Sequence, residues 1–89
     1  MRAIMTVTGL DHTGIIAAVS TALAELDINI INVSQTLMDN YFTMIMHIEF
    51  DETKQPIASI QERMHDVELQ QSLRIRVQSE TLFEEMHTL

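Results

Sequence analysis

The residues best suited to chemistry lie in one short loop, Gly9–Gly14, where Asp11 and His12 are adjacent. A carboxylate and an imidazole are the usual groups of general acid–base catalysis, but they must converge in a pocket to act together. Neighbouring loop residues rarely point the same way. The sequence also has no Cys, no Ser-centred elbow and no phosphate-binding loop. We therefore expect no enzymatic activity, and His12 is the residue to test should a turnover be found.

Four histidines invite a metal hypothesis. None has a second histidine one helical turn away, and no Cys is available to complete a zinc site; the four are His12, His47, His65 and His87. We therefore predict no metal site and no cofactor. Of the four, His12 is the best placed to touch a ligand or an ion, because Asp11 precedes it in the loop.

The elements around the loop follow from the period of the apolar pattern. Alternating apolar residues predict strands, and apolar residues spaced by three and four predict helices. The expected strands are 2–8, 29–38, 41–50 and 73–78, and the expected helices are 14–26, a second from about Pro56, and a short third after residue 79. Asp39 and Asn40 fit a tight hairpin, and Asp11 or Thr13 can cap the first helix. A Thr81–Glu84 capping box opens the last helix.

This order, βαββαβ, predicts a ferredoxin-like α+β sandwich with a four-stranded antiparallel sheet and two helices on one face. We expect one domain, residues 1–89, with 79–89 as a C-terminal helical extension. Gln35 falls between Val33 and Leu37 on the face expected to be buried, either as a structural hydrogen-bonding group or as a site residue. Several methionines are expected to fill the core, namely Met5, Met44, Met46 and Met64.

The other face of the sheet carries a mixture of polar and apolar side chains. There we expect Arg74 and Arg76 to form a solvated salt-bridge network with Glu49 and His47. An open sheet edge and a partly apolar second face are liabilities for a chain of 89 residues. We therefore predict a homodimer, or a dimer of dimers.

Composition excludes some classes of binding partner. The formal charge is −8, with 13 acidic residues against 5 Lys and Arg, so neither nucleic acid nor an anionic membrane is an expected partner. There is no signal peptide and no apolar run of membrane-spanning length, which makes the cytoplasm the expected location.

Three segments resemble the ACT domain family, and most closely its stand-alone, single-domain members. The segments are Val7–Ala17 (VTGLDHTGIIA), Leu23–Ile30 (LAELDINI) and Ser34–Met38 (SQTLM), with a similar ending at Phe83–His87 (FEEMH). The resemblance covers essentially the whole chain. It implies a regulatory, non-catalytic module that binds a small ligand, often an amino acid, where the first loop meets a neighbouring subunit.

The resemblance also implies which residues touch the ligand. The expected set is Leu10, Asp11, His12, Thr13, Gly14, Ile15 and Asn29. The amides that open the first helix suit a carboxylate, Asp11 suits an ammonium group, and Asn29 would reach the ligand across the interface. Purely structural roles are the alternatives: a tight turn for Gly14, a helix cap for Asp11 and a local hydrogen bond for Asn29. Thr13 stands where many relatives have Pro, and Gly9 where serine-sensing relatives have His.

The alternative function is an assembly module that binds another protein and no small ligand. Its motivation is the apolar stripe of the last helix, formed by Leu82, Phe83, Met86 and Leu89. Sequence alone identifies neither the ligand nor a regulated partner.

Overall fold

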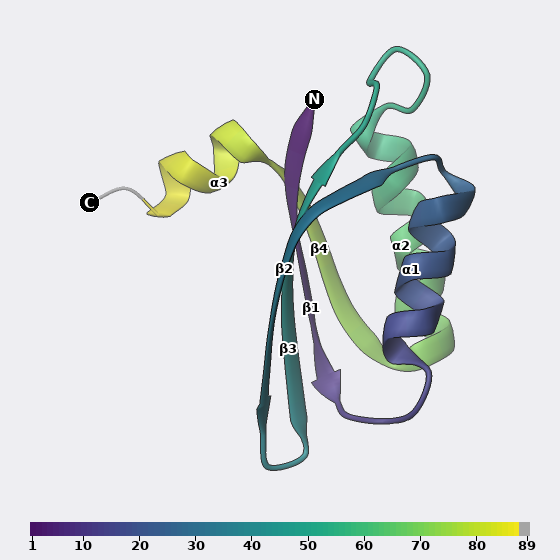
Figure 1. Ribbon diagram of the computed structural model, residues 1–89, viewed down its shortest axis with the longest axis vertical. Helices are drawn as coiled ribbons and strands as arrows, with labels where there is room; N and C mark the ends of the chain where they lie inside the picture. Colours follow the sequence, from purple (N-terminus) through teal and green to yellow (C-terminus); the bar gives the residue numbers. More distant parts are fainter. Residues whose placement is uncertain (88–89) are drawn as a thin grey trace.

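The computed structural model describes residues 1–87, apart from the side chains of residues 83 and 85–87 (Figure 1). The elements are β1 (Arg2–Leu10), α1 (Ile15–Glu25), β2 (Asn29–Met38), β3 (Tyr41–Glu49), α2 (Ile57–Gln71), β4 (Leu73–Ser79) and α3 (Glu80–His87). All neighbouring strands are antiparallel in the order β2-β3-β1-β4. The predicted ferredoxin-like α+β fold with a short C-terminal helix is confirmed.

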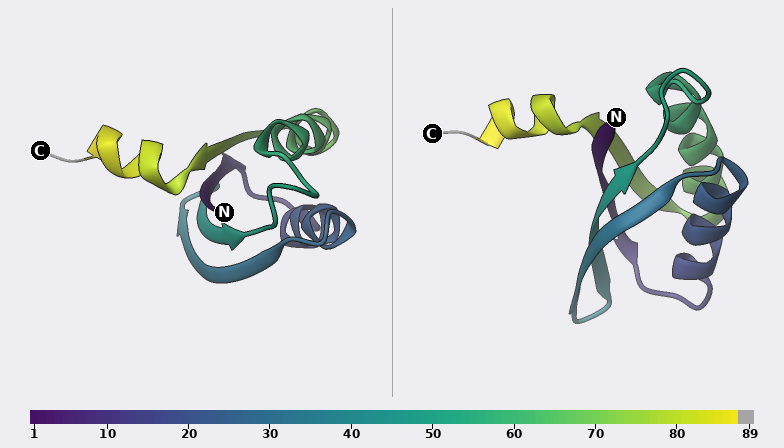
Figure 2. Two further views of the ribbon diagram at one scale, coloured as in Figure 1. Left: turned by 90° about the horizontal axis from the view of Figure 1, so that it is seen from above. Right: turned by 45° about the horizontal axis from the view of Figure 1, so that its top comes forward.

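The core lies between the sheet and the two helices that cover one of its faces (Figure 2). β1 is central and pairs with both β3 and β4, so that Met5 lies opposite Met46 on one side and Val77 on the other. The helices contribute buried stripes at helical spacing, namely Val19, Ala22 and Leu23 from α1 and Ile60, Met64 and Val67 from α2. The four methionines expected in the core are all buried, which confirms their role as filler.

The two edges of the sheet differ in how far their main-chain groups are bonded. Along β4, the Ile75 amide donates to Glu68 Oε2 at 2.7 Å, and Gln61 Nε2 donates to the Val77 carbonyl at 2.9 Å. Side chains of α2 therefore occupy groups on the outer edge of β4. β2, at the other edge, is exposed from Ile31 to Met38, and it carries a register shift between Ile30 and Asn32.

The prediction that Gln35 is buried is wrong. Its cross-strand partner, Met44, is buried on the helix side of the sheet, yet Gln35 and its neighbours Val33 and Leu37 are all exposed. The physical reason is the position of β2 at the edge of the sheet. No residue of β2 is buried, whereas the residues of neighbouring β3 that face the helices are. Alternation assigned the correct face, but the face is open at this edge.

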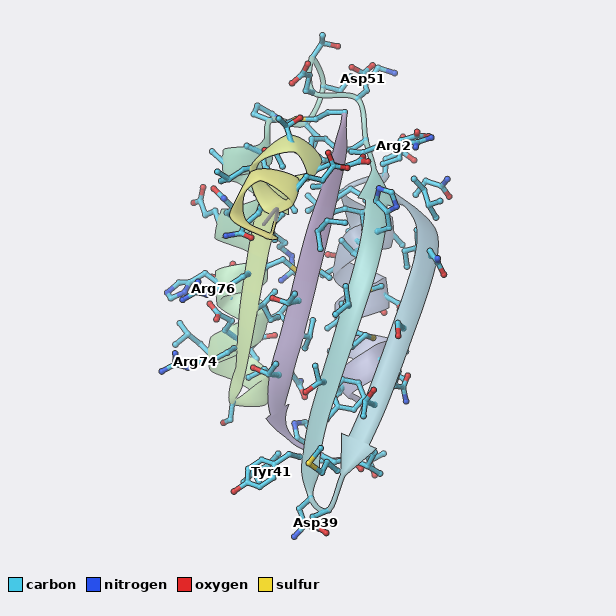
Figure 3. The ribbon with its side chains drawn as sticks, turned by 90° about the vertical axis from the view of Figure 1, so that its left-hand side faces the viewer. Arg2, Asp39, Tyr41, Asp51, Arg74 and Arg76 are labelled. Carbon is cyan, nitrogen blue, oxygen red and sulfur yellow. The ribbon has the colours of Figure 1, made fainter. Side chains whose placement is uncertain are left out.

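The outer face, opposite the helices, is uncovered over most of its area (Figure 3). Arg2 pairs with Glu49 at 3.2 Å, and His47 pairs with Glu80 of α3 at 3.2 Å. Arg74 and Arg76 form no ion pair with any residue that the structure describes, so the predicted network with Glu49 is wrong. The register explains this, because Arg2 stands directly opposite Glu49 whereas β4 lies beyond β1.

The predicted local caps also differ from the structure. Gly14 occupies the position before α1, with φ of 95° and no side-chain hydrogen bond, so neither Asp11 nor Thr13 caps this helix. The Ser79 hydroxyl, rather than the Thr81 box, accepts the Leu82 amide at 3.1 Å at the start of α3. In the β2–β3 hairpin, Asp39 takes the positive φ, at 54°. No helix within the described residues is long and apolar enough to cross a membrane.

Candidate functional site

The loop between β1 and α1 is fixed at both ends by main-chain bonds. β1 continues to Leu10, which pairs with Tyr41, and the Asp11 amide then donates to the Asn40 carbonyl at 2.7 Å. This ties the loop to the β2–β3 hairpin. At its other end Gly14 adopts a left-handed conformation that non-glycine residues take only with strain, and its carbonyl accepts the Ala18 amide at 2.9 Å.

A pocket of about 360 Å³ opens where this loop meets the sheet. Its lining consists of Asp11, His12, Thr13, Gly14, Ile15, Ile16, Ala17, Gln35 and Phe42. Ile15 and Phe42 are buried and supply apolar surface, whereas Asp11 and Gln35 supply exposed polar groups. The pocket therefore combines an apolar wall with a carboxylate and an amide, which is the usual make-up of a small-molecule site.

The start of α1 adds hydrogen-bond donors to this pocket. The Ala18 amide makes the first helical bond, so the amides of Ile15, Ile16 and Ala17 precede the ladder and lack a partner within the helix. The positive end of the helix dipole reinforces these donors. Together they favour a carboxylate or another small anion beside the loop.

His12 is held by two main-chain carbonyls. Its Nε2 lies 2.9 Å from the Gln71 carbonyl at the end of α2, and its Nδ1 lies 3.1 Å from the Thr13 carbonyl. Only the protonated ring can donate from both nitrogens, so the Gln71 and Thr13 carbonyls, with the nearby Asp11 charge, raise the pKa of His12 above its ordinary value of 6.5. His12 thus joins the loop to α2 through both of its polar atoms.

The structure brings together five of the seven predicted site residues, those from Asp11 to Ile15. Leu10 lies outside the pocket: alternation along β1 directs it to the outer face, and its side chain is 59% exposed. Asn29 lies at the far end of β2, paired with Glu49, so within one chain it does not reach the loop. Four residues outside the predicted set complete the lining, namely Ile16, Ala17, Gln35 and Phe42; of these, only Gln35 was considered as a site residue from the sequence.

A second, larger pocket of about 590 Å³ lies at the other edge of the sheet, between α2, β4 and α3. Its lining is mostly apolar, with one charged side chain, in the set Met1, Ile57, Gln61, Ile75, Arg76, Val77, Gln78, Ser79 and Leu82. Gln61 already donates to the Val77 carbonyl and the Ser79 hydroxyl already accepts the Leu82 amide, so size alone does not make it the better candidate site.

The histidines do not converge. His12 bonds to main-chain carbonyls, His47 lies 3.2 Å from Glu80, and His65 lies 3.2 Å from Glu68. Among the described residues no three His, Cys, Asp or Glu side chains are grouped so that they could hold a metal ion. The side chain of His87 is outside the described set.

The fold and the pocket define a class, a ferredoxin-like α+β domain with a ligand-sized pocket at the start of its first helix. The chain matches the ACT domain family over residues 2–78, and it belongs to that family. ACT domains are commonly regulatory ligand-binding modules. The match ends before α3.

Known proteins agree with this assignment. The chain is 71% identical to a UPF0237 protein of Corynebacterium glutamicum over 93% of each chain, and 45% identical to one of Clostridium perfringens over the full length of both. Among solved structures it is similar to an ACT domain protein from Streptococcus pneumoniae, with 40% identity, 94% of each chain covered and a TM-score of 0.82. The crystal structure of a putative glycine cleavage system transcriptional repressor shares the fold, with 21% identity, 86% of this chain and 44% of that chain covered and a TM-score of 0.77.

Proposed function

We propose that this chain is a non-catalytic regulatory module that binds a free amino acid in the Asp11–Ala17 pocket. The observation that carries the proposal is the pairing of opposite charges at one small site. The uncapped amides at the start of α1 suit an α-carboxylate, and the Asp11 carboxylate suits an α-ammonium group. A zwitterion presents both charges within a few atoms of each other.

The rest of the pocket supports the same ligand class. Ile15 and Phe42 offer apolar surface to a side chain, and the Gln35 amide offers both a donor and an acceptor. Gly14 has no side chain, so the ligand can approach the main chain closely there. His12 acts indirectly in this proposal, because its ring nitrogens face the Gln71 and Thr13 carbonyls rather than the pocket.

A second copy of the chain completes this site in our proposal. β2 is the open edge, and its exposed apolar residues Val33 and Leu37 flank unpaired strand groups. Antiparallel pairing of β2 with the same strand of a second copy sets the start of one strand beside the end of the other. The partner's Asn29, about 20 Å from its own Gln35 at about 3.3 Å per residue, then approaches this pocket.

Calorimetric titration with a panel of amino acids tests the proposal. We expect at least one to bind the folded protein, and Asp11→Ala to weaken that binding about 10- to 100-fold, since hydrogen bonds between charged groups contribute about 1.5–3 kcal/mol. The matched control is Asp66→Ala, which removes an exposed carboxylate from α2. Absence of binding by every member of the panel, or equal loss in both variants, contradicts the proposal.

The role of the partner has its own test. Val33→Lys places a charge on the open β2 edge and is expected to halve the sedimenting mass, whereas Leu69→Lys, on exposed α2 surface, leaves the assembly intact. Asn29→Ala should weaken ligand binding without changing the sedimenting mass. Full affinity in the Val33→Lys variant, once its sedimenting mass has halved, contradicts a shared site.

A further inference from the structure

α3 projects from the outer face of the sheet, away from the two helices that cover the core (Figures 1 and 2). It begins where β4 ends, beside Ala3 of β1, and Glu80 in its first turn bonds to His47. An isolated helix of eight residues is not stable in water and needs packing to persist. Leu82 is 46% exposed on this helix.

Basic side chains outnumber acidic ones on the outer face, where Glu49 is paired with Arg2, whereas the sequence of α3 is acidic. The outer face carries Arg2, Arg74 and Arg76, which are three of the five Lys and Arg residues of a chain with a formal charge of −8. Arg74 and Arg76 are exposed and form no ion pair with the described part of the chain (Figure 3). The sequence of α3 contains three acidic residues, Glu80, Glu84 and Glu85.

The same face carries an apolar row at the end farthest from α3. Leu10, Tyr41 and Met38 stand side by side on three neighbouring strands, and all three are strongly exposed. Arg74 lies close to this row, since it pairs with Thr8, two residues before Leu10. The helix with an exposed leucine therefore lies at one end of the face, and the other end offers the apolar row with Arg74 beside it and Asp39 in the hairpin beyond it.

We propose that a second copy of this chain docks on the outer face, so that α3 of each copy packs against the Leu10, Tyr41 and Arg74 end of the other. A two-fold axis that runs across the strands exchanges the two ends of the face and keeps β4 opposite β4. The partner's α3 then arrives beside Arg74 and Arg76. The contact is reciprocal, so it closes after two copies.

The dimensions fit this arrangement. Facing sheets pack about 10 Å apart, and a helix of eight residues at about 1.5 Å per residue is about 12 Å long. A helix that stands out from its own sheet therefore spans the gap to the partner's sheet. This interface is separate from the β2 edge and from the Asp11–Ala17 pocket, so it stands or falls independently of the proposed function.

Cysteine cross-linking gives a direct test, because the protein has no native Cys. The double variant Leu10→Cys with Leu82→Cys places thiols about 30 Å apart within one chain, at about 3.3 Å per strand residue from Leu10 to Met1, which lines the same pocket as Leu82. Pairing through β2 leaves Leu10 about 29 Å, or six strand spacings, from the partner's β4, which leads into the helix that carries Leu82. A short thiol cross-linker therefore joins them only across the proposed interface.

We expect covalent dimers from this variant and background levels from the matched control, Leu69→Cys with Leu82→Cys, whose first thiol lies on the helix side of the protein. Equal cross-linking in the two variants overturns the proposal. The measurement needs no ligand, so it remains informative even if no amino acid binds.

A charge reversal tests the electrostatic part. Arg74→Glu with Arg76→Glu should halve the sedimenting mass and weaken association about tenfold or more. Adding Glu84→Arg and Glu85→Arg restores the original net charge and should restore the mass. Lys54→Glu with Arg63→Glu changes the net charge equally on other surfaces and should leave the mass unchanged. An unchanged mass in the first variant, an equal loss in the control, or no restoration each overturns the proposal.

Discussion

Replacement of Gly14 by alanine isolates the contribution of backbone conformation at the site. Gly14 has φ of 95°, and a Cβ built at this position meets no atom within 4 Å. The substitution therefore adds no steric clash, and what remains is the strain of an L-residue in the left-handed region, about 1–2 kcal/mol. For a domain of this size that loss lowers Tm by about 5–15 °C.

Urea unfolding followed by circular dichroism measures this change as a shift of the midpoint at constant slope. Gly14→Asn is the informative companion, because Asn adopts the left-handed conformation several times more readily than Ala, so it should lose less stability. Equal stability of Gly14→Ala and the parent, or a larger loss in Gly14→Asn, refutes the strain argument. Gly14→Ala should also bind the ligand more weakly than the parent protein, because strain at residue 14 displaces the amides at the start of α1.

Three further perturbations follow from contacts away from Gly14. Because the pKa of His12 is raised, its stabilising effect is full below pH 6.5 and is lost as the pH rises through the folded-state pKa. His12→Gln should therefore flatten the fall in unfolding free energy as the pH rises above 6.5, and an unchanged slope contradicts this. Met64→Ala, in the core, should destabilise by about 2–5 kcal/mol in urea, against less than about 0.5 kcal/mol for exposed Leu69→Ala. Glu68→Ala leaves the Ile75 amide without its acceptor and should lose about 1–3 kcal/mol by the same assay, with Glu68→Gln largely preserved; equal losses count against the edge contact.

The fold was predictable because its central strands alternate without interruption. Ala3, Met5 and Val7 face the helices just as the pattern of β1 indicates, and a strand buried on one face leaves no ambiguity about register. β2 was harder, since its alternation specifies a face and says nothing about whether a helix lies over it. Gln35 was therefore expected to be buried, and its exposure follows from the position of β2 at the edge of the sheet.

The site was predictable where it is contiguous and hidden where it is not. Asp11 through Ile15 follow one another along the chain, so one loop places all of them in the pocket. Phe42 and Gln35 enter from a hairpin that folds back beside that loop, through the Asp11–Asn40 bond. Local pattern carries no signal for such a contact. That Arg74 forms no ion pair with the described residues likewise depends on strand order, because Arg2 stands between β4 and Glu49.

The side chains that α2 lays along β4 limit how large an assembly of these sheets can grow. A sheet open at both edges accepts a neighbour on each side, and repeated addition makes a filament. Here Glu68 and Gln61 occupy donors and acceptors at one edge, so a copy has one free edge to offer. Two such copies that pair through β2 use up both free edges at once. The two hydrogen bonds along the outer edge of β4 thus oppose the addition of further copies at that edge, and removal of the Glu68 side chain would weaken this protection.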